Sequence, residues 1–267
     1  MKFMPVVIGM LLAWVMVICT QTALAEAVVE RTVAISGVNQ LHIEGDGALR
    51  LRIGDTPSLK MTALASELET IKVDASGELL RIRQKGRWGW SSRRAKIQYE
   101  LTLQTFEGLT LNGGLDVDVL SPVVADDFYL HINGGGAIRM TELTLNDEFF
   151  AKLNGGCELN IAALNAHVID VTGNGAADIT IAGRVQKQLL KFNGAAEYHA
   201  FQLESETVEI RSSGANAARL WVTGQLDLHL NGAGGIYYYG DAQVHSNISG
   251  VGSVERKGDK PSVGVKE

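Results

Sequence analysis

Apolar and polar residues alternate along most of the chain, in short runs separated by glycine-containing turns. Around Asn133, Leu130 and Ile132 precede the turn and Ile138 follows it, with polar or small residues between them. Apolar residues at every second position indicate strands with one buried face. No sustained 3.6-residue period occurs in residues 109–258. We therefore predict that this region is all-β.

The turns recur at a nearly constant spacing. Eight Asn-Gly, Ser-Gly or Thr-Gly corners follow one another at intervals of 18 to 21 residues. Their first residues are Asn112, Asn133, Asn154, Thr172, Asn193, Ser213, Asn231 and Ser249. Repeats of this length, with two or three short strands each, are typical of coils that stack in parallel and share backbone hydrogen bonds. We predict an all-β, single-stranded right-handed parallel β-helix, a solenoid of roughly 18–21-residue coils.

The corner Asn side chains admit two interpretations. They could form a row of ligand-binding amides, or a ladder in which each side chain bonds to the next coil. We favour the ladder, because a binding site rarely needs the same residue in every repeat. The corner glycines are expected to adopt a backbone conformation that other residues avoid.

Residues 26–108 repeat less regularly. We interpret them as irregular first coils and a cap within the same domain, because a solenoid must cover its exposed end. Residues 79–84 and 95–103 alternate, and we predict that they pair as a hairpin. Regular coils are expected over residues 109–258 and a polar tail over residues 259–267.

The start of the chain is strongly apolar. Lys2 precedes an apolar run that extends from Met4 to Cys19, and Ala23-Leu24-Ala25 supplies the small residues of a cleavage site. We predict a signal peptide over residues 1–25, since the run is short for a transmembrane anchor, the alternative. The mature chain is then expected to lack a transmembrane segment and to be exported, to the periplasm or the outer-membrane or cell surface of a Gram-negative-type bacterium.

Composition supports a repetitive, exported fold. The chain has 30 glycines but only 4 prolines, which favours regularly spaced corners over disorder. Cleavage would leave Cys157 without a partner, so we expect a small buried residue and no internal disulfide. The net charge of −6 disfavours nucleic acid as a partner. The six histidines do not recur at one repeat position, and no cofactor or metal motif is present. We therefore predict neither a cofactor nor a metal site.

Outward-facing carboxylates occur singly at this spacing. Asp118 and Asp178 fall in one outward column and Asp116, Glu158 and Glu197 in another, interrupted by Arg or Ala. Polysaccharide lyases and hydrolases, which also adopt parallel β-helices, need carboxylates gathered on neighbouring coils. We predict no such cluster and no catalytic residue. A non-enzymatic protein is favoured, and a carbohydrate-active β-helix stays open as the alternative.

One candidate contact surface is the basic loop over residues 83–96. It carries six basic residues and no acidic one. Its candidate contact residues are Arg87, Trp88, Trp90, Arg93 and Arg94. Positive charge with tryptophan suits contact with anionic lipid, lipopolysaccharide or envelope glycan. Alternatively, the tryptophans fold back over the open end of the solenoid.

A second candidate is the run Tyr237-Tyr238-Tyr239 near the last coil. By alternation Tyr238 should point inward, which leaves Tyr237 and Tyr239 outside. Exposed tyrosines can stack on sugars, but here they could equally pack beneath the terminal tail.

With its repeats laid out, the chain resembles the family known as putative auto-transporter adhesin, head GIN domain, a domain of unknown function. The resemblance covers about residues 30–258 and rests on Glu44-Gly45-Asp46-Gly47, on GELLRI at 77–82, on the serial corners and on the closing stretch at 235–258. The family typically has a proline in its last inter-corner turn, where this chain has Asp241-Ala242. The resemblance implies a right-handed β-helix in an envelope or surface protein, with no catalytic residues to carry over. We expect a β-helical scaffold or an adhesion-type binding module.

Overall fold

A computed structural model describes residues 27–85 and 97–260 of the chain. These residues form fourteen strands and one short helix. The elements are β1 (Val28–Ala34), β2 (Gln40–Glu44), β3 (Gly47–Ile53), β4 (Ser58–Leu64), α1 (Ala65–Thr70), β5 (Ile71–Ser76), β6 (Leu79–Gln84), β7 (Gln98–Leu103), β8 (Gly108–Val119), β9 (Val123–Ala125), β10 (Phe128–Met140), β11 (Leu143–Leu145), β12 (Glu148–Gly194), β13 (Glu197–Tyr239) and β14 (Gln243–Arg256).

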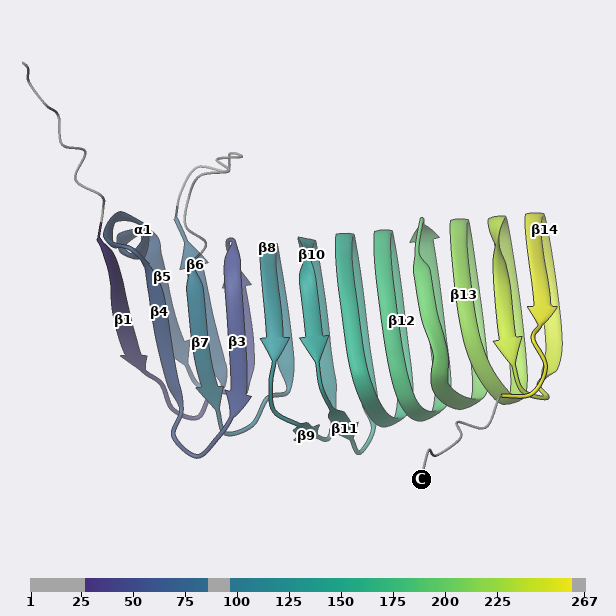
Figure 1. The fold of residues 1–267 in the computed structure, drawn as a ribbon, viewed down its shortest axis with the longest axis horizontal. Coiled ribbons are helices and arrows are strands. Elements are labelled where there is room, and N and C mark those ends of the chain that lie inside the picture. The colour runs from purple at the N-terminus through teal and green to yellow at the C-terminus, as the bar shows by residue number, and fades with distance from the viewer. Residues whose placement is uncertain (1–26, 86–96, 261–267) are drawn as a thin grey trace, which may run out of the picture.

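From β8 onward the chain winds into one stack of parallel coils (Figure 1). β8, β10, β12, β13 and β14 pair in that order, and β12 and β13 continue through more than one coil each. Asn112, Asn133 and Asn154 lie opposite one another, as Asn231 and Ser249 do further along. The predicted parallel β-solenoid is confirmed.

One predicted corner is wrong. Asn174, and not Thr172, occupies the fourth position: its Nδ2 donates to Oδ1 of Asn154 at 2.9 Å, and its own Oδ1 accepts from Asn193 at 3.0 Å. The stretch VTGNG contains two corner-like pairs, Thr172-Gly173 and Asn174-Gly175. They lie two residues apart, so either choice gives the same inward and outward alternation.

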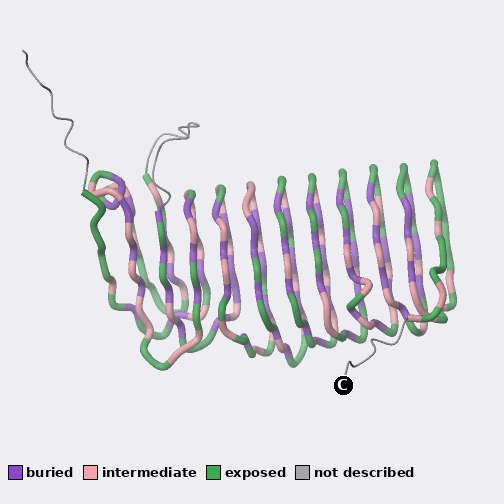
Figure 2. The backbone as a smooth tube through the Cα atoms, in the orientation of Figure 1, coloured by how far each residue is buried: buried purple, intermediate pink, exposed green. Residues whose placement is uncertain are grey.

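Buried residues alternate with exposed ones along each coil (Figure 2). The buried side chains form the core of the solenoid. Leu, Ile and Val predominate, and the rings of Phe106, Phe128 and Phe149 stack on successive turns with centroids 5.0 and 6.2 Å apart. Cys157 is buried, as predicted, and this burial raises the pKa of its thiol.

The interior position in the coil of Asn174 is taken by Gly173. The ring of Phe192, from the next coil, comes within 3.1 Å of where a Cβ on Gly173 would lie. The Phe192 ring thus occupies the space that a side chain on Gly173 would need, and the core stays closely packed.

The corner glycines form a continuous column. Each has a φ between +107° and +139°, which side chains rarely adopt, and a Cβ on it would approach the carbonyl oxygen of the previous corner glycine to less than 3.0 Å. The column comprises Gly113, Gly134, Gly155, Gly175, Gly194, Gly214, Gly232 and Gly250, with Gly45 below the first. Glycine is therefore needed for both the turn and the close stacking of coils.

Beside this column the corner asparagines form the predicted ladder. Side-chain hydrogen bonds of 2.8 to 3.0 Å join each residue to the next in the series Asn112, Asn133, Asn154, Asn174 and Asn193. Each amide thus bonds within the protein, and the structural interpretation is confirmed for these five.

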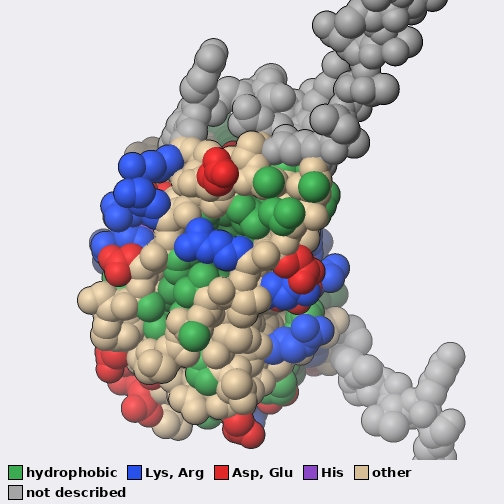
Figure 3. All heavy atoms as spheres, turned by 90° about the vertical axis from the view of Figure 1, so that its left-hand side faces the viewer, with side chains coloured by type: hydrophobic (Ala, Val, Ile, Leu, Met, Phe, Trp, Pro, Cys, Tyr) green, Lys and Arg blue, Asp and Glu red, His purple; other side chains and the backbone are tan. Residues whose placement is uncertain are grey.

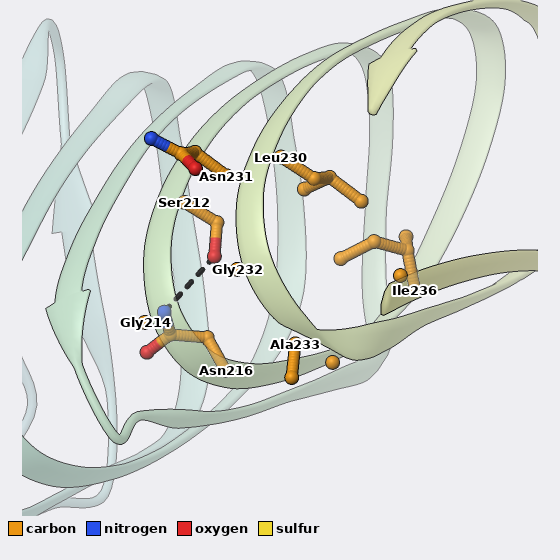
Figure 4. Close-up of a pocket in the computed structure, with 10 residues that line it drawn as sticks. Ser212, Gly214, Asn216, Leu230, Asn231, Gly232, Ala233 and Ile236 are labelled. Carbon is orange, nitrogen blue, oxygen red and sulfur yellow. Dashed lines mark hydrogen bonds between the residues drawn. The ribbon is translucent and has the colours of Figure 1, made fainter. Parts of the chain in front are cut away.

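Ser213 breaks the ladder, and Asn216 compensates. Its Oδ1 accepts from the Ala196 amide at 2.7 Å, and its Nδ2 donates to Ser212 Oγ at 2.9 Å and to the Ser213 carbonyl. The cavity beside these residues (Figure 4) measures about 10 Å³, room for at most one water.

A second polar group lies inside the coils. Tyr198 donates to Gln188 Oε1 at 2.7 Å, and Gln188 Nε2 donates to Ser205 Oγ. Burial raises the pKa of Tyr198, so its hydroxyl stays protonated and can donate. All three residues are fully buried, and these hydrogen bonds offset the cost of removing them from water.

In the N-terminal part, the order in which the strands pair differs from their order along the chain. β2 and β3 pair in parallel with β8, and β6 and β7 stack on their other side, against β2 and β3 respectively. The predicted hairpin of residues 79–84 with 95–103 is therefore wrong. β6 and β7 lie on two faces of one coil, and β6 instead forms a hairpin with β5.

Antiparallel strands close this end. β4 pairs with β7 and β1 with β4, and α1 follows β4 directly. Figure 3 looks onto this end and shows hydrophobic side chains with Lys and Arg side chains beside and across them. Val28 of β1 is 61% exposed. The predicted irregular first coils and cap thus correspond to a displaced coil covered by antiparallel strands.

The last described coil, at the C-terminal end, differs from the N-terminal end in its strand pairing. β14 pairs with β13 only, and Ile248, at an interior position of the coil, is 38% exposed. Residues 257 and 258 continue alongside the preceding coil, where the Lys257 amide donates to the Tyr238 carbonyl and the Gly240 amide donates to the Gly258 carbonyl. No helix within the described residues is both long and apolar enough to cross a membrane.

Candidate functional site

Three aromatic side chains line one outer face of the last coils. Phe201, Trp221 and Tyr239 each follow a corner residue by eight positions, and each is partly exposed. The rings of Phe201 and Tyr239 lie 4.8 Å apart at an angle of 58°. We call these three residues the aromatic flank. They face away from the interior of the coil, which lies on the opposite side of the strand.

The tail places an ammonium group over this flank. Lys260 Nζ lies 5.3 Å from the Trp221 ring centroid and 5.5 Å from that of Tyr239, and it donates to the Phe201 carbonyl. Distances below about 6 Å allow cation–π attraction. Burial lowers the pKa of Lys260, while the ring faces and the carbonyl favour its charged form.

The predicted tyrosines fall partly within this surface. Tyr238 is 7% exposed and points inward, as predicted, while Tyr237 and Tyr239 are partly exposed. Tyr239 belongs to the aromatic flank, and Tyr237 lies beneath Lys257, whose Nζ is 4.8 Å from its ring centroid. The tail therefore covers both tyrosines, the second of the two predicted arrangements. Whether either ring binds a sugar stays a prediction.

Sequence reasoning missed Phe201, Trp221 and Lys260. The two aromatic residues could have been found by reading eight positions beyond Asn193 and Ser213, the offset that also gives Tyr239. Lys260 has no repeat position, so no spacing places it there.

A second surface results from the corrected fourth corner. With Asn174 in the ladder, Glu158, Asp178 and Glu197 occupy the same position on three successive coils, since Asp178 pairs with Glu197. They line an open groove of about 540 Å³ together with Asp116 and Arg139. The prediction that carboxylates stay single is therefore wrong for these three.

The carboxylates of this acidic row are exposed and lie close to basic side chains. His199 contacts Asp178 at 3.6 Å and Glu197 at 3.3 Å, and Arg139 contacts Glu158 at 3.8 Å. The three carboxylates are 50 to 63% exposed. Such pairs are solvated and contribute under about 1 kcal/mol each to stability. Within residues 27–85 and 97–260, no group of three or more His, Cys, Asp or Glu side chains could hold a metal ion.

A third surface lies at the opposite end of the solenoid. It is formed by Lys72 of β5, Arg81 and Arg83 of β6, and Lys85 directly after β6, with Lys72 directly opposite Arg83. Lys72 beside Lys85 lowers the pKa of the Lys85 ammonium, and Arg83 adds to this effect. None of the four forms an ion pair with a carboxylate of the described residues. We call them the basic cluster.

The predicted contact loop begins within this cluster. Arg87, Trp88, Trp90, Arg93 and Arg94 lie outside the described residues. The segments on either side of them, which end at Lys85 and begin again at Ile97, belong to the displaced coil of β6 and β7.

Comparison with known proteins bears on the family and the fold. A model of the family described as putative auto-transporter adhesin, head GIN domain, matches residues 38–242. No curated protein matches the sequence.

Solved structures share the architecture at low sequence identity. Putative adhesins from Parabacteroides merdae and Parabacteroides distasonis are each 18% identical, with TM-scores of 0.71 and 0.72; each match covers 86% of this chain, and 95% and 97% of theirs. A putative lipid binding protein from Parabacteroides distasonis is 17% identical with a TM-score of 0.67, over 86% of this chain and 96% of that one. At this identity the likeness shows the fold alone.

Proposed function

We propose that this chain, which belongs to the putative auto-transporter adhesin, head GIN domain family, is an exported, non-enzymatic binding module of the cell envelope. Its solenoid serves as a rigid rod, and the end that carries the basic cluster docks on an anionic envelope surface. The predicted signal peptide and the family both support an envelope location.

The observation that carries this proposal is the close grouping of four cations in the basic cluster, beside which Asp74 lies opposite Arg81 and Glu44 opposite Arg83 in the strand register. Three of its side chains lie on the adjacent strands β5 and β6 and Lys85 directly follows β6, and none of the four forms an ion pair with a carboxylate of the described residues. Close cations repel one another, and an anion placed between them relieves this repulsion. Each Lys or Arg near an anionic lipid surface contributes about 1 kcal/mol to binding.

Two further observations agree with an anionic surface. The sequence from 86 to 96 adds Arg87, Arg93 and Arg94, together with Trp88 and Trp90. Tryptophan favours the interface between lipid headgroups and hydrocarbon. One structural neighbour, from Parabacteroides distasonis, is described as a putative lipid binding protein. Lipopolysaccharide and acidic glycans offer the same negative charge.

Reversing the cluster's charge should abolish docking. We expect Lys72→Glu/Lys85→Glu to bind vesicles of phosphatidylglycerol and phosphatidylcholine at least tenfold more weakly than the unaltered protein at low salt, since about 1 kcal/mol is lost per cation removed. Co-sedimentation measures this. The matched control is Lys152→Glu/Lys187→Glu, which changes the net charge equally at exposed lysines of β12.

The control should keep most of its binding, because its lysines lie away from the basic cluster. Equal loss in both variants would contradict docking through this end and indicate attraction by net charge alone. In the same assay, Trp88→Ala/Trp90→Ala/Arg93→Ala tests the loop, and unchanged sedimentation would remove the loop from the proposal.

A carbohydrate-active enzyme is the second candidate, favoured only by the acidic row of Glu158, Asp178 and Glu197. Glycosidases use a carboxyl pair in which one member is protonated, a state that burial promotes. Because these three are exposed and paired with Arg139 or His199, we propose instead that they stabilise contacts between coils.

A further inference from the structure

We propose that the aromatic flank is a binding site for a primary alkylammonium group, and that Lys260 of the same chain is its built-in occupant. The site lies on β13, at the other end of the solenoid from the basic cluster (Figure 1). It therefore stands independently of the proposed docking on an anionic surface.

The first argument is the geometry around the Lys260 ammonium. Ring faces of Trp221 and Tyr239 lie 5.3 and 5.5 Å away, on two successive coils. The Phe201 ring packs against the Tyr239 ring, with 4.8 Å between the two ring centroids. Attraction between a cation and a ring face strengthens when the cation is partly desolvated, as Lys260 is.

The second argument is the hydrogen-bond acceptor in the site. The Phe201 carbonyl accepts from Lys260 Nζ. β12 and β13 shift register here: Thr180 lies opposite His199, but Ala182 lies opposite Gln202. This irregularity adds one residue to β13, and such bulges re-aim backbone groups away from the strand ladder. The carbonyl at the bulge thus faces the ammonium.

The acceptor defines the class of ligand. A primary ammonium has N–H donors for the Phe201 carbonyl as well as positive charge for the rings. A quaternary ammonium has the charge but no donor. The site therefore favours groups such as the ammonium of ethanolamine or of an alkylamine over choline-like groups.

The way the tail is attached makes Lys260 a replaceable occupant. Backbone hydrogen bonds fix the tail at Lys257 and Gly258, at 2.7 and 3.0 Å, and Arg256 Nε adds a bond of 2.7 Å to the Gly240 carbonyl. These contacts lie before Lys260 in the chain, so the tail stays attached when the lysine leaves the flank. A tethered group competes like a free ligand at about millimolar concentration.

Binding can be followed by the fluorescence of Trp221 in a protein that has no other tryptophan. The four tryptophans are Trp14, Trp88, Trp90 and Trp221, so Trp14→Phe/Trp88→Phe/Trp90→Phe in the full chain leaves Trp221 alone. In this parent, Lys260→Ala is titrated with n-butylammonium chloride at constant ionic strength while Trp221 fluorescence is recorded. The matched control is Lys257→Ala, which removes a tail lysine that lies over Tyr237.

We expect saturable binding of n-butylammonium to the Lys260→Ala protein, with an apparent Kd about tenfold or more below that of the parent, because the tethered competitor is gone. Lys257→Ala should behave as the parent does. Tetramethylammonium should bind Lys260→Ala clearly more weakly than n-butylammonium.

Two results would overturn the proposal. Absence of saturable binding to a folded Lys260→Ala protein would mean that the flank only anchors the tail. If tetramethylammonium bound equally well, the Phe201 carbonyl would not contribute to binding, and the site would have no preference for primary ammonium groups. We expect calorimetry to detect no binding of n-butylammonium to Lys260→Ala/Tyr239→Ala, because the aromatic rings form the site.

Discussion

Replacing Gly155 by alanine is expected to destabilise the protein by about 3 kcal/mol or more, although it adds one methyl group. Gly155 has a φ of +121°, and a Cβ there would approach the Gly134 carbonyl oxygen to less than 3.0 Å. Both obstacles are backbone, so no side chain can move aside. Relief would require two coils to separate and their ladder to lengthen.

The adjacent Gly156 provides the control. Its φ lies outside the left-handed region, and the nearest atom to an added Cβ is the Ala176 carbonyl oxygen at 4.0 Å. Gly156→Ala should therefore change the free energy of unfolding by less than about 0.5 kcal/mol. Urea unfolding followed by circular dichroism measures both variants. Equal stability of the two would contradict the register of coils described here.

Removal of the Phe192 ring should cost about 4–5 kcal/mol. Phe192 is 1% exposed, and its ring packs over Gly173 and lies 5.7 Å from that of Tyr198. Since Gly173 has no side chain, nothing on that side can fill the cavity left by Phe192→Ala. Large cavities that cannot collapse give the highest costs among core substitutions.

Phe150 is the matched control for this substitution. It points outward from β12, only partly buried, and its ring contacts that of Tyr129 with centroids 6.4 Å apart. Phe150→Ala should lower the free energy of unfolding by only about 1 kcal/mol. A loss at Phe192 no larger than this would mean that Phe192 does not face the interior.

Most of the solenoid could be predicted from sequence, for a physical reason. Each coil stacks on a nearly identical coil, so inward positions such as Leu130, Ile132 and Ile138 recur at a fixed offset from each corner. Side-chain alternation and corner spacing together determine the coil. They also identify Tyr238 as buried.

The fourth corner could not be resolved in this way. Thr172-Gly173 and Asn174-Gly175 differ by two residues, the period of a strand, so alternation fits both. Only stacking distinguishes them, because Gly175 fits the glycine column and Asn174 the amide ladder. This ambiguity concealed the acidic row of Glu158, Asp178 and Glu197.

The hairpin was mispredicted because alternation does not specify a strand's partner. β6 and β7 are consecutive along the chain, as the strands of a hairpin are, but β6 pairs with β2 and β7 with β3, on two faces of one coil. Their partners β2 and β3 precede them by 39 and 50 residues respectively, as the pairs Gln40–Leu79 and Ala48–Gln98 show, and no local pattern reveals such non-local pairing. The aromatic flank was missed in part for the same reason, since Lys260 reaches it from the tail.

The most direct test of a non-enzymatic envelope-binding module measures retention and turnover on the same sample. The protein is applied to an array of envelope glycans, lipopolysaccharide and anionic phospholipid, and the unbound fractions are assayed for new reducing ends and unsaturated sugars. We predict salt-sensitive retention on anionic members of the array without any released product. Product release that is lost in Glu158→Gln/Asp178→Asn would contradict this account and identify the acidic row as a catalytic site.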